Sequence, residues 1–523
     1  MLRRTLLALT LIASPAFAAD YDLLIRNARI VDGSGATWFR GDLGVRADTI
    51  AAIDRHLTGS ATRTIDAHDL VLAPGFIDLH THARRGIFEV PTADNYIRQG
   101  VTTLFEGPDG SSPMPLRDFF AKLQQTKTAP NMASFVGQGT VREKVIGNVD
   151  RKATADEIEK MKAIVRQEMS DGAFGLSTGL FYVPGTFTPT EEVIALASVA
   201  GEMGGIHISH QRDETAKIRD SVRETIRIGE EGHLPTQATH MKVLGKPNWG
   251  ASGDTLKLVD DARARGVDVT MDQYPYTASS TSLAAALMPS WSLEGGREQM
   301  LSRMKDPAQR AKIRAVVIDR IEHERGGGDP SNIQFASTDF DASLAGKTLA
   351  DATRARGLEV TILNAADTAI ALLEKGSVSG IFHAMAEADV QRILRHPATM
   401  IASDGEVPIF GKGSPHPRSY GTFVRVLGHY VRDLHVITLE DAVRKMTSLP
   451  AARVGLHDRG LLRPGMKADL VVFDPAMVAD KATYENPHQF AVGVPYVVVN
   501  GVLIVDDGKV TGARPGRVLR HGT

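Results

Sequence analysis

The stretch Val71-Leu-Ala-Pro-Gly-Phe-Ile-Asp-Leu-His-Thr-His82 is an apolar run that ends in two histidines separated by one residue. Side chains alternate between the two faces of a β-strand, so residues two apart point in the same direction. His80 and His82 can therefore bind one metal ion together, because imidazole is a common ligand of zinc and similar ions. The alternative is a His-x-His pair that lies on a surface strand by chance. The apolar residues before the pair, and the polar residues at later strand ends, favour a metal site.

Residues 73–460 alternate short apolar strands with helical patterns. The expected strands are Gly75–His82, Val101–Glu106, Ala133–Val136, Ala173–Ser177, Gly205–His210, Thr236–Lys242, Val267–Tyr276 and Thr399–Asp404. Helical periodicity over Ala155–Met169, Glu191–Met203, Thr215–Glu230 and Gly253–Arg265 separates several of them. Eight strands in this order predict an α/β fold with a TIM-like (β/α)₈ barrel, whose active site lies at the carboxyl ends of the strands. We interpret residues 281–397 as an insertion before the last strand, of a kind that often forms a lid.

The two ends of the chain have a different pattern. Residues 20–72 and 461–523 contain short β-branched runs that end at Asp-Gly and Asn-Gly pairs, such as Asn500-Gly501 and Asp507-Gly508. Because this pattern of short strands and turns is confined to the two ends, we expect one small β-sandwich built from both chain termini.

The first residues of the chain have the pattern of an export signal. Met1-Leu-Arg-Arg4 is positively charged, Thr5–Ala13 is apolar, and Ala16-Phe-Ala18 is a small-x-small cleavage site. Residues 1–19 are therefore interpreted as a signal peptide, and the mature protein as periplasmic or secreted. The apolar run is too short to span a bilayer, and we expect no transmembrane segment.

Composition excludes several classes of site. The net charge of −2 gives no indication of a nucleic-acid partner, and no pattern indicates an oligomeric state. The chain contains no cysteine, which excludes disulfides and a cysteine nucleophile. Any metal must therefore be held by histidine, aspartate or glutamate.

Residues that can bind a metal follow several of the predicted strands. A single histidine or carboxylate at such a place is more often an ordinary packing residue, but their joint occurrence at equivalent strand ends favours one site. Together they suit one or two divalent ions with a position left for water. Asp404 can take a proton from that water and pass it to a leaving amine, so the pattern predicts metal-assisted hydrolysis of an amide. With Asp404, the set of metal-competent residues at the predicted strand ends contains His80, His82, Glu106, Asp109, His210 and His240.

The motifs resemble those of a known family. Pro74–His82 resembles the first-strand signature of the amidohydrolase superfamily. Matches to its N-acyl-D-amino-acid deacylase (D-aminoacylase) family are found at Gly172–Leu180, Ser209–Glu214, His240–Gly245, Asp272–Thr281 and His416–Phe423. The resemblance implies a barrel with a β-sandwich, bound zinc, and hydrolysis of N-acyl-D-amino acids, or of related D-configured acyl amino acids or peptides, to a carboxylate and a free amino acid.

The resemblance also implies roles for individual residues. It makes the four histidines of the set metal ligands, Asp404 the general base, and Lys242, Tyr274 and Ser280 the residues that hold the substrate carboxylate. A cation and two hydroxyls suit an anionic group. For Tyr274 and Ser280, ordinary loop packing is the alternative.

This chain departs from the family at the end of the second strand. Family members have Gly-Asn-Cys-Gly there, with the cysteine as a ligand, whereas this chain has Gly107-Pro-Asp-Gly110, and Glu106 is also within reach. Because a carboxylate is harder than a thiolate and can bridge two ions, one or two Zn²⁺ ions or another divalent metal all stay open. The fourth strand ends in Gly175-Leu-Ser-Thr-Gly179 without a lysine, which argues against a carbamylated-lysine bridge.

Other functions fit parts of the same pattern. A cyclic amidase or imidase, or a carboxypeptidase-like amidohydrolase, would use the same fold and metal. Gly175-Leu-Ser-Thr-Gly179 also matches the nucleophile elbow of serine hydrolases, with Ser177 as the nucleophile, but that interpretation leaves the strand-end histidines unexplained. A non-catalytic periplasmic binding protein is disfavoured because the ligand set and the base are both complete.

Overall fold

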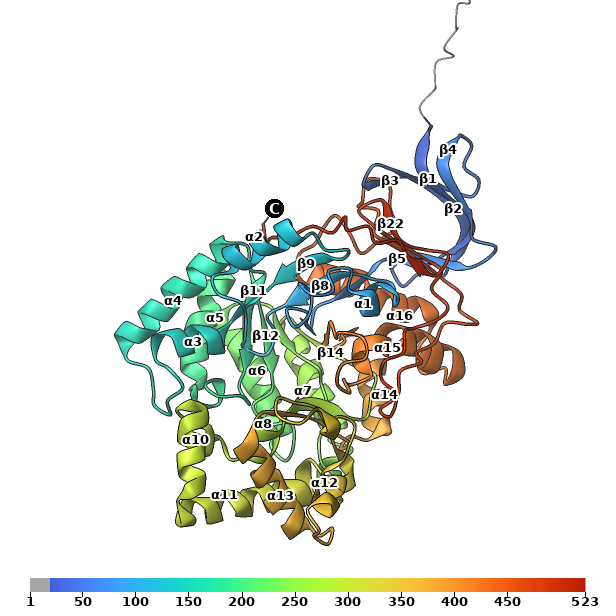
Figure 1. Ribbon diagram of the computed structural model, residues 1–523. Coiled ribbons are helices and arrows are strands. Elements are labelled where there is room, and N and C mark those ends of the chain that lie inside the picture. Colours follow the sequence, from blue (N-terminus) through green and yellow to red (C-terminus); the bar gives the residue numbers. More distant parts are fainter. Residues whose placement is uncertain (1–18, 523) are drawn as a thin grey trace, which may run out of the picture.

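The computed structural model describes residues 19–522, which form a mixed α/β fold (Figure 1). The predicted signal peptide, residues 1–19, lies outside this range except for its last residue, so export of the chain stays a prediction. Within residues 19–522, no helix has both the length and the apolar character needed to cross a membrane.

Parallel strands form the centre of the molecule in two ladders, ordered β6-β8-β9 and β10-β11-β12-β13-β14-β18. Their bounds are β6 (Phe76–Asp78), β8 (Val101–Glu106), β9 (Asn131–Ser134), β10 (Val136–Gly137), β11 (Gly175–Gly179), β12 (Ile206–His210), β13 (Thr236–Ala238), β14 (Val269–Gln273) and β18 (Thr399–Ile401). All of these pairings are parallel. Each of the eight strand segments predicted from the sequence overlaps one of these strands, and the third segment overlaps both β9 and β10.

The two ladders approach each other at both ends. β9 ends two residues before β10 begins, so the chain passes directly from one ladder to the other. On the opposite side, β7 (Thr81–His82) pairs in parallel with β19 (Gly405–Glu406). The Asp78 carboxylate accepts hydrogen bonds from the backbone N–H of Ser403 at 3.1 and 3.2 Å. These contacts bring the carboxyl ends of the first and last strands together.

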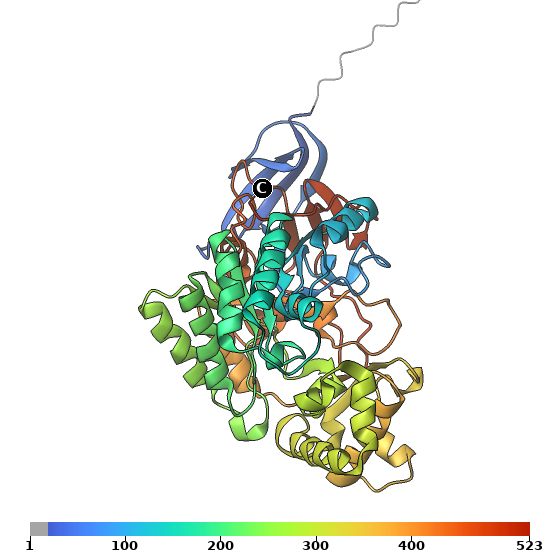
Figure 2. The ribbon, with the colours of Figure 1, turned by 90° about the vertical axis from the view of Figure 1, so that its left-hand side faces the viewer.

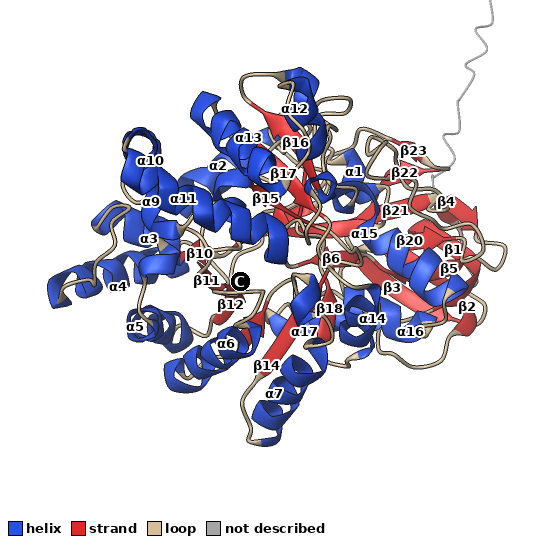
Figure 3. Ribbon diagram, turned by 90° about the horizontal axis from the view of Figure 1, so that it is seen from below, coloured by secondary structure: helices blue, strands red, loops and turns tan. Residues whose placement is uncertain are grey.

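Helices pack around the parallel strands, as Figure 3 shows from below. The main ones are α2 (Leu116–Thr126), α3 (Gln138–Val145), α4 (Ala155–Ser170), α5 (Thr190–Glu202), α6 (Ile218–Gly232), α7 (Ser252–Ala264), α14 (Glu387–Arg395), α15 (Arg418–Arg425), α16 (Leu439–Met446) and α17 (Ser448–Arg453). α4 begins with a capping box, in which Thr154 and Glu157 satisfy each other's backbone N–H groups. Its buried residues Met161, Val165 and Met169 recur every four positions, so one apolar stripe faces the core.

Strands from both ends of the chain share one nine-stranded sheet, seen in blue and red in Figure 1. The order is β23-β22-β21-β20-β5-β1-β2-β3, and β4 pairs with β1. The bounds are β1 (Tyr21–Ile30), β2 (Phe39–Arg46), β3 (Thr49–Asp54), β4 (Ala61–Asp66), β5 (Val71–Pro74), β20 (Leu470–Phe473), β21 (Tyr496–Val499), β22 (Val502–Asp506) and β23 (Lys509–Val510). Leu43 from one end packs in the same buried cluster as Leu470 and Val498 from the other.

The predicted insertion contains a hydrophobic core of its own, and Figure 2 shows this yellow part of the chain beside the central strands. Its antiparallel sheet has the order β15-β17-β16, with bounds β15 (Ser279–Ser282), β16 (Ile333–Thr338) and β17 (Val378–Phe382). The helices are α8 (Leu283–Leu287), α9 (Ser290–Leu293), α10 (Gly296–Lys305), α11 (Pro307–Asp319), α12 (Leu349–Ala355) and α13 (Ile362–Lys375). Its buried residues include Leu283, Ile313 and Phe335.

Candidate metal centre

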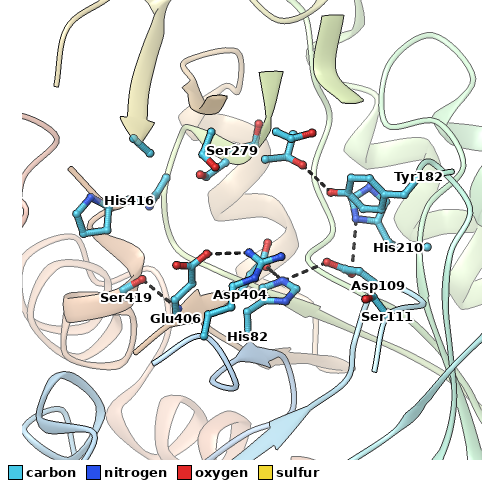
Figure 4. A pocket seen from close by; sticks show the side chains of 18 of the residues that line it. His82, Asp109, Ser111, Tyr182, His210, Ser279, Asp404, Glu406, His416 and Ser419 are labelled. Atoms are coloured by element: carbon cyan, nitrogen blue, oxygen red, sulfur yellow. Dashed lines mark hydrogen bonds and ion pairs between the residues drawn. The ribbon is translucent and has the colours of Figure 1, made fainter. Parts of the chain in front are cut away.

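A cavity of about 860 Å³ opens where the parallel strands end. Its walls come from two parts of the chain: His82, His210 and Asp404 from the strand ends, and Arg325 and Ser379 from the insertion. Figure 4 shows His82, Asp109 and Asp404 together at the centre of this pocket. The insertion therefore completes the pocket that the central strands begin.

The first group of metal-competent side chains joins the two ends of the strand set. His80 and His82 each place Nε2 3.3 Å from the Asp109 carboxylate. The Oδ1 atom of Asp404 lies 3.1 Å from the Nε2 atom of His82 and 3.5 Å from that of His80. These four residues lie close enough to hold one ion.

The second group contains Asp109, His210 and His240. The Nδ1 atom of His210 lies 3.6 Å from Asp109 Oδ1, and the Nε2 atom of His240 lies 3.4 Å from the same oxygen. The two ring nitrogens are 2.7 Å apart. One nitrogen from each of the four predicted histidines thus points at Asp109, which is the residue the two groups share.

The donor set fits zinc or a similar divalent ion. Imidazole nitrogens and a carboxylate are the ligands that such ions take when no thiolate is present. Both ring nitrogens of His80, Nδ1 of His82 and Oδ1 of Asp109 are buried, and none has a hydrogen-bond partner among residues 19–522. Buried polar atoms are normally satisfied, so these atoms indicate a site built for an ion.

Glu106, the other candidate from the second strand, belongs to neither group. Its side chain is fully buried, and one oxygen accepts a hydrogen bond of 2.8 Å from the backbone N–H of Arg84. The other oxygen lies 3.1 Å from the Arg84 guanidinium. The structure therefore brings Asp109 to the histidines and pairs Glu106 with a cation instead.

Three of the site residues have left-handed backbone conformations. The φ angles are 57° at Asp109, 34° at His240 and 52° at Asp404. Such conformations are uncommon for residues other than glycine and occur where surrounding contacts hold them. The Asp272 carboxylate provides one such contact by accepting a hydrogen bond of 2.7 Å from the His240 N–H.

Ser177 holds the loop that carries Asp109. Its hydroxyl is fully buried, accepts a hydrogen bond from the Gly110 N–H at 3.2 Å, and donates one to the Gly107 carbonyl. A serine nucleophile needs an accessible hydroxyl beside a base. Ser177 therefore has a structural role here, and the serine hydrolase alternative loses its nucleophile.

Lys242 is buried and bonded within the protein. Its Nζ atom lies 2.5 Å from Glu214 Oε1 and 2.7 Å from the Nδ1 atom of His240. The same Glu214 oxygen is 3.3 Å from that nitrogen, so the His240 ring faces the centre with one nitrogen and a carboxylate with the other. Carboxylates in this position orient metal-binding histidines. Sequence reasoning missed Glu214, although its place four residues after His210 offered a signal.

Arg418, the first residue of α15, is a second residue that sequence reasoning missed, although it stands inside one of the matching motifs. Its guanidinium lies 2.8 Å from Asp404 Oδ2 and 4.9 Å from the centre of the Tyr274 ring. It also donates a hydrogen bond of 3.4 Å to the Ser280 carbonyl. Burial favours the neutral carboxyl, but Arg418 and His80 hold the pKa of Asp404 well below its ordinary value, so Asp404 is ionised.

Lys242, Tyr274 and Ser280, which the sequence predicts to hold the substrate carboxylate, all line the cavity together with Arg418. Tyr274 is almost fully buried, and its ring also lies 5.6 Å from Lys242 Nζ. The structure thus brings the three predicted residues to one wall. It adds a cation that touches Asp404 as well.

Comparisons with known proteins find relatives over nearly the whole chain. Residues 63–505 match the model of the Amidohydrolase family. The D-aminoacylase of Alcaligenes xylosoxydans xylosoxydans is 38% identical over 97% of this chain and 99% of that protein. The N-acyl-D-aspartate deacylase of the same organism is 34% identical, with 96% of both chains covered.

Among solved structures, the N-acyl-D-glutamate deacylase of Bordetella bronchiseptica, complexed with zinc and a phosphonate inhibitor, superimposes with a TM-score of 0.81. It is 34% identical, with 96% of this chain and 99% of that chain covered. The chain therefore belongs to the amidohydrolase family, in its N-acyl-D-amino-acid deacylase branch.

Proposed function

We propose that this protein hydrolyses the amide bond of N-acyl-D-amino acids, releasing a carboxylate and a free D-amino acid, at a centre of one or two zinc ions. The convergence of four histidines on Asp109 beside an open cavity carries the proposal. The named activities of the full-length relatives support the substrate class. Linear substrates are favoured over cyclic amides because buried cations line the cavity and suit a free carboxylate.

His80, His82, Asp109, His210 and His240 would hold the metal. When bound, it polarises the substrate carbonyl and lowers the pKa of water towards neutrality. Asp404 is ionised and so can accept a proton at Oδ1 from the attacking water. The water oxygen forms the new bond to the carbonyl carbon. Asp404 then passes the proton to the amide nitrogen as the carbon–nitrogen bond breaks.

The residues around Asp404 orient both the base and the substrate. Arg418 binds the Oδ2 atom of Asp404 and so leaves Oδ1 directed at the histidines. Tyr274, Ser280 and Lys242 lie on the same wall and are placed to hold the α-carboxylate. Arg418 lines the cavity beside Tyr274 and Ser280, so we assign it a share in binding that carboxylate.

The arrangement of the chain supports a matching proposal for the architecture. We infer that the two parallel ladders together form a (β/α)₈ barrel over residues 73–460, with an insertion at about 281–397. The parallel order of the strands and the pairing of β7 with β19 support this. We infer that residues 20–72 and 461–523 fold as a small β-sandwich, and the buried cluster that both ends of the chain share supports this. A backbone hydrogen bond of 2.8 Å from Ile50 in β3 to Met466 also supports this arrangement.

Residues 1–19 direct export to the periplasm or medium, where acylated D-amino acids or peptides would be the substrates.

Paired assays test the proposed activity. We expect the zinc-loaded enzyme to hydrolyse N-acetyl-D-leucine much faster than N-acetyl-L-leucine and to leave a hydantoin ring intact. Equal or L-favoured rates would overturn the D-specificity while leaving a metal amidohydrolase. Ring opening without hydrolysis of either linear substrate would favour the cyclic amidase alternative.

A further inference from the structure

Arg325 is a buried cation in the wall of the cavity with no role in the proposed reaction. It follows the short helix Arg320–Glu324 in the insertion and precedes Gly326. Only 3% of its surface is exposed. It lines the main cavity and also an adjoining pocket of about 110 Å³. Its charge therefore lies where the two spaces meet.

Aromatic rings hold the guanidinium of Arg325 close to the metal centre. The group lies 5.0 Å from the centre of the Phe181 ring and 6.0 Å from that of Phe382. The Phe181 ring in turn stacks on His210 at 5.7 Å. A single aromatic ring thus separates Arg325 from a residue of the metal centre. Figure 4 shows His210 and Tyr182 on one side of the pocket and His416 on the other.

The Arg325 guanidinium forms no hydrogen bond and no ion pair with any residue in the described range 19–522. Its Nε atom is buried without a partner. The neighbouring carboxylate of Glu324 pairs with Arg320 instead, at 3.8 Å. Other cations of the cavity differ in this respect, since Lys242 and Arg418 each have a carboxylate partner.

The two aromatic contacts do not compensate for this burial. A cation–π contact contributes about 0.5–2 kcal/mol. Burying an unpaired ion costs several kcal/mol even after the protein relaxes. Buried polar groups are normally paired, so an unpaired buried cation beside a substrate cavity points to an anionic partner that the ligand supplies.

We propose that Arg325 binds a second carboxylate of the substrate, beyond the α-carboxylate, and so gives the enzyme a preference for dicarboxylic substrates. This inference rests on the proposed deacylase function. The guanidinium presents a planar fork of donors that matches a carboxylate in two parallel hydrogen bonds. The α-carboxylate is assigned to the wall of Arg418 and Tyr274, so the second carboxylate extends towards Phe181. It belongs either to an acidic D-side chain or to a dicarboxylic acyl group.

Two pairs of substrates distinguish these sources. N-acetyl-D-glutamate against N-acetyl-D-leucine tests the side chain, and N-succinyl-D-leucine against N-acetyl-D-leucine tests the acyl group. We measure kcat/KM of the zinc-loaded wild type, Arg325→Met and Arg325→Lys. The ratio of acidic to neutral substrate should fall about 30-fold or more in Arg325→Met for one pair, since losing one partner of a buried charge pair has an effect of this size. For Arg325→Lys, the ratio should lie between those of the wild type and Arg325→Met, because lysine keeps the charge but lacks the planar fork of donors.

Lys412→Met is the matched control, because Lys412 lines the same cavity but is exposed. It removes one positive charge, and screening should keep its effect on both ratios within about threefold. Arg325→Met should also melt at the same temperature as the wild type or higher, since it removes an unpaired buried charge.

The outcomes separate the inference from the proposed function. Ratios that stay unchanged in both pairs, while N-acetyl-D-leucine is still hydrolysed, would refute the role of Arg325 and leave the deacylase intact. A melting temperature lowered by several degrees in Arg325→Met would instead show a structural role and also refute the inference. No hydrolysis of any D-substrate by the wild type would overturn the proposed function itself.

Discussion

Asp109→Asn is the substitution that most sharply tests how the metal centre is built. The change keeps the size of the side chain and removes its charge. In the structure, the Asp109 carboxylate lies 3.3–3.6 Å from one nitrogen of each of four histidines and is common to both metal-competent groups. We therefore expect both positions to lose metal together, rather than one of them.

The size of the expected loss in metal affinity depends on whether the carboxylate binds the metal directly or only orients a ligand. Substituting a residue that only orients a ligand lowers metal affinity about 10–100-fold. Asp109 is placed as a ligand itself, so the loss for Asp109→Asn should exceed about 100-fold. Glu106→Gln is the matched control, because Glu106 is a buried carboxylate from the same strand end that faces Arg84 instead. It should bind zinc with an affinity close to that of the wild type.

The assay is competition for zinc with a chromophoric chelator, with bound metal measured per folded chain by mass spectrometry. Circular dichroism confirms that each variant is folded before the metal is counted. Loss of zinc in Glu106→Gln with retention in Asp109→Asn would refute the assignment. Loss of only one zinc in Asp109→Asn, from a wild type that binds two, would refute the shared position of the carboxylate.

Three further substitutions probe the surroundings of the centre. Glu214→Gln leaves the Lys242 charge buried without a partner and releases the His240 ring, so zinc affinity in the chelator assay should fall about 10–100-fold. Asp404→Asn should lower kcat on N-acetyl-D-leucine about 10²–10⁴-fold in steady-state assays, and an unchanged kcat would rule out Asp404 as the base. Burial lowers the pKa of His207 to about 3, below its unfolded value of about 6.5, so acidification from pH 6.5 towards 3 should cost up to about 1.4 kcal/mol of unfolding free energy per pH unit. Urea unfolding at several pH values should show a shallower acid dependence in His207→Gln, and an identical dependence would contradict this contribution.

The central strands and the His-x-His pair could be predicted because strand geometry is local. Two histidines separated by one residue face the same way in any strand, and the apolar runs before the strand ends are visible in the sequence. The same local rule could not decide between Glu106 and Asp109. Glu106 is the last residue of β8, whereas Asp109 lies beyond Gly107 with a φ of 57°, and this turn directs its carboxylate to the histidines.

The charge pairs of the site could not be predicted from the sequence. Lys242 meets Glu214 and Asp404 meets Arg418 because loops after different strands converge on one cavity. No periodic pattern records such a contact, since it depends on how the strand ends are placed in space. The prediction for Lys242 considered only its charge and missed the partner. Arg325 was missed for the same reason, because its unpaired state depends on the packing of Phe181 and Phe382 around it.

The most direct test of the proposed enzyme is a zinc titration of the fully stripped protein. Bound zinc and the rate of N-acetyl-D-leucine hydrolysis are measured in the same samples, with Ser177→Ala titrated in parallel. We expect a rate at background before zinc is added, and a rate that rises with bound zinc in both proteins. Hydrolysis by the stripped wild type, lost in a folded Ser177→Ala variant, would contradict a metal-dependent deacylase.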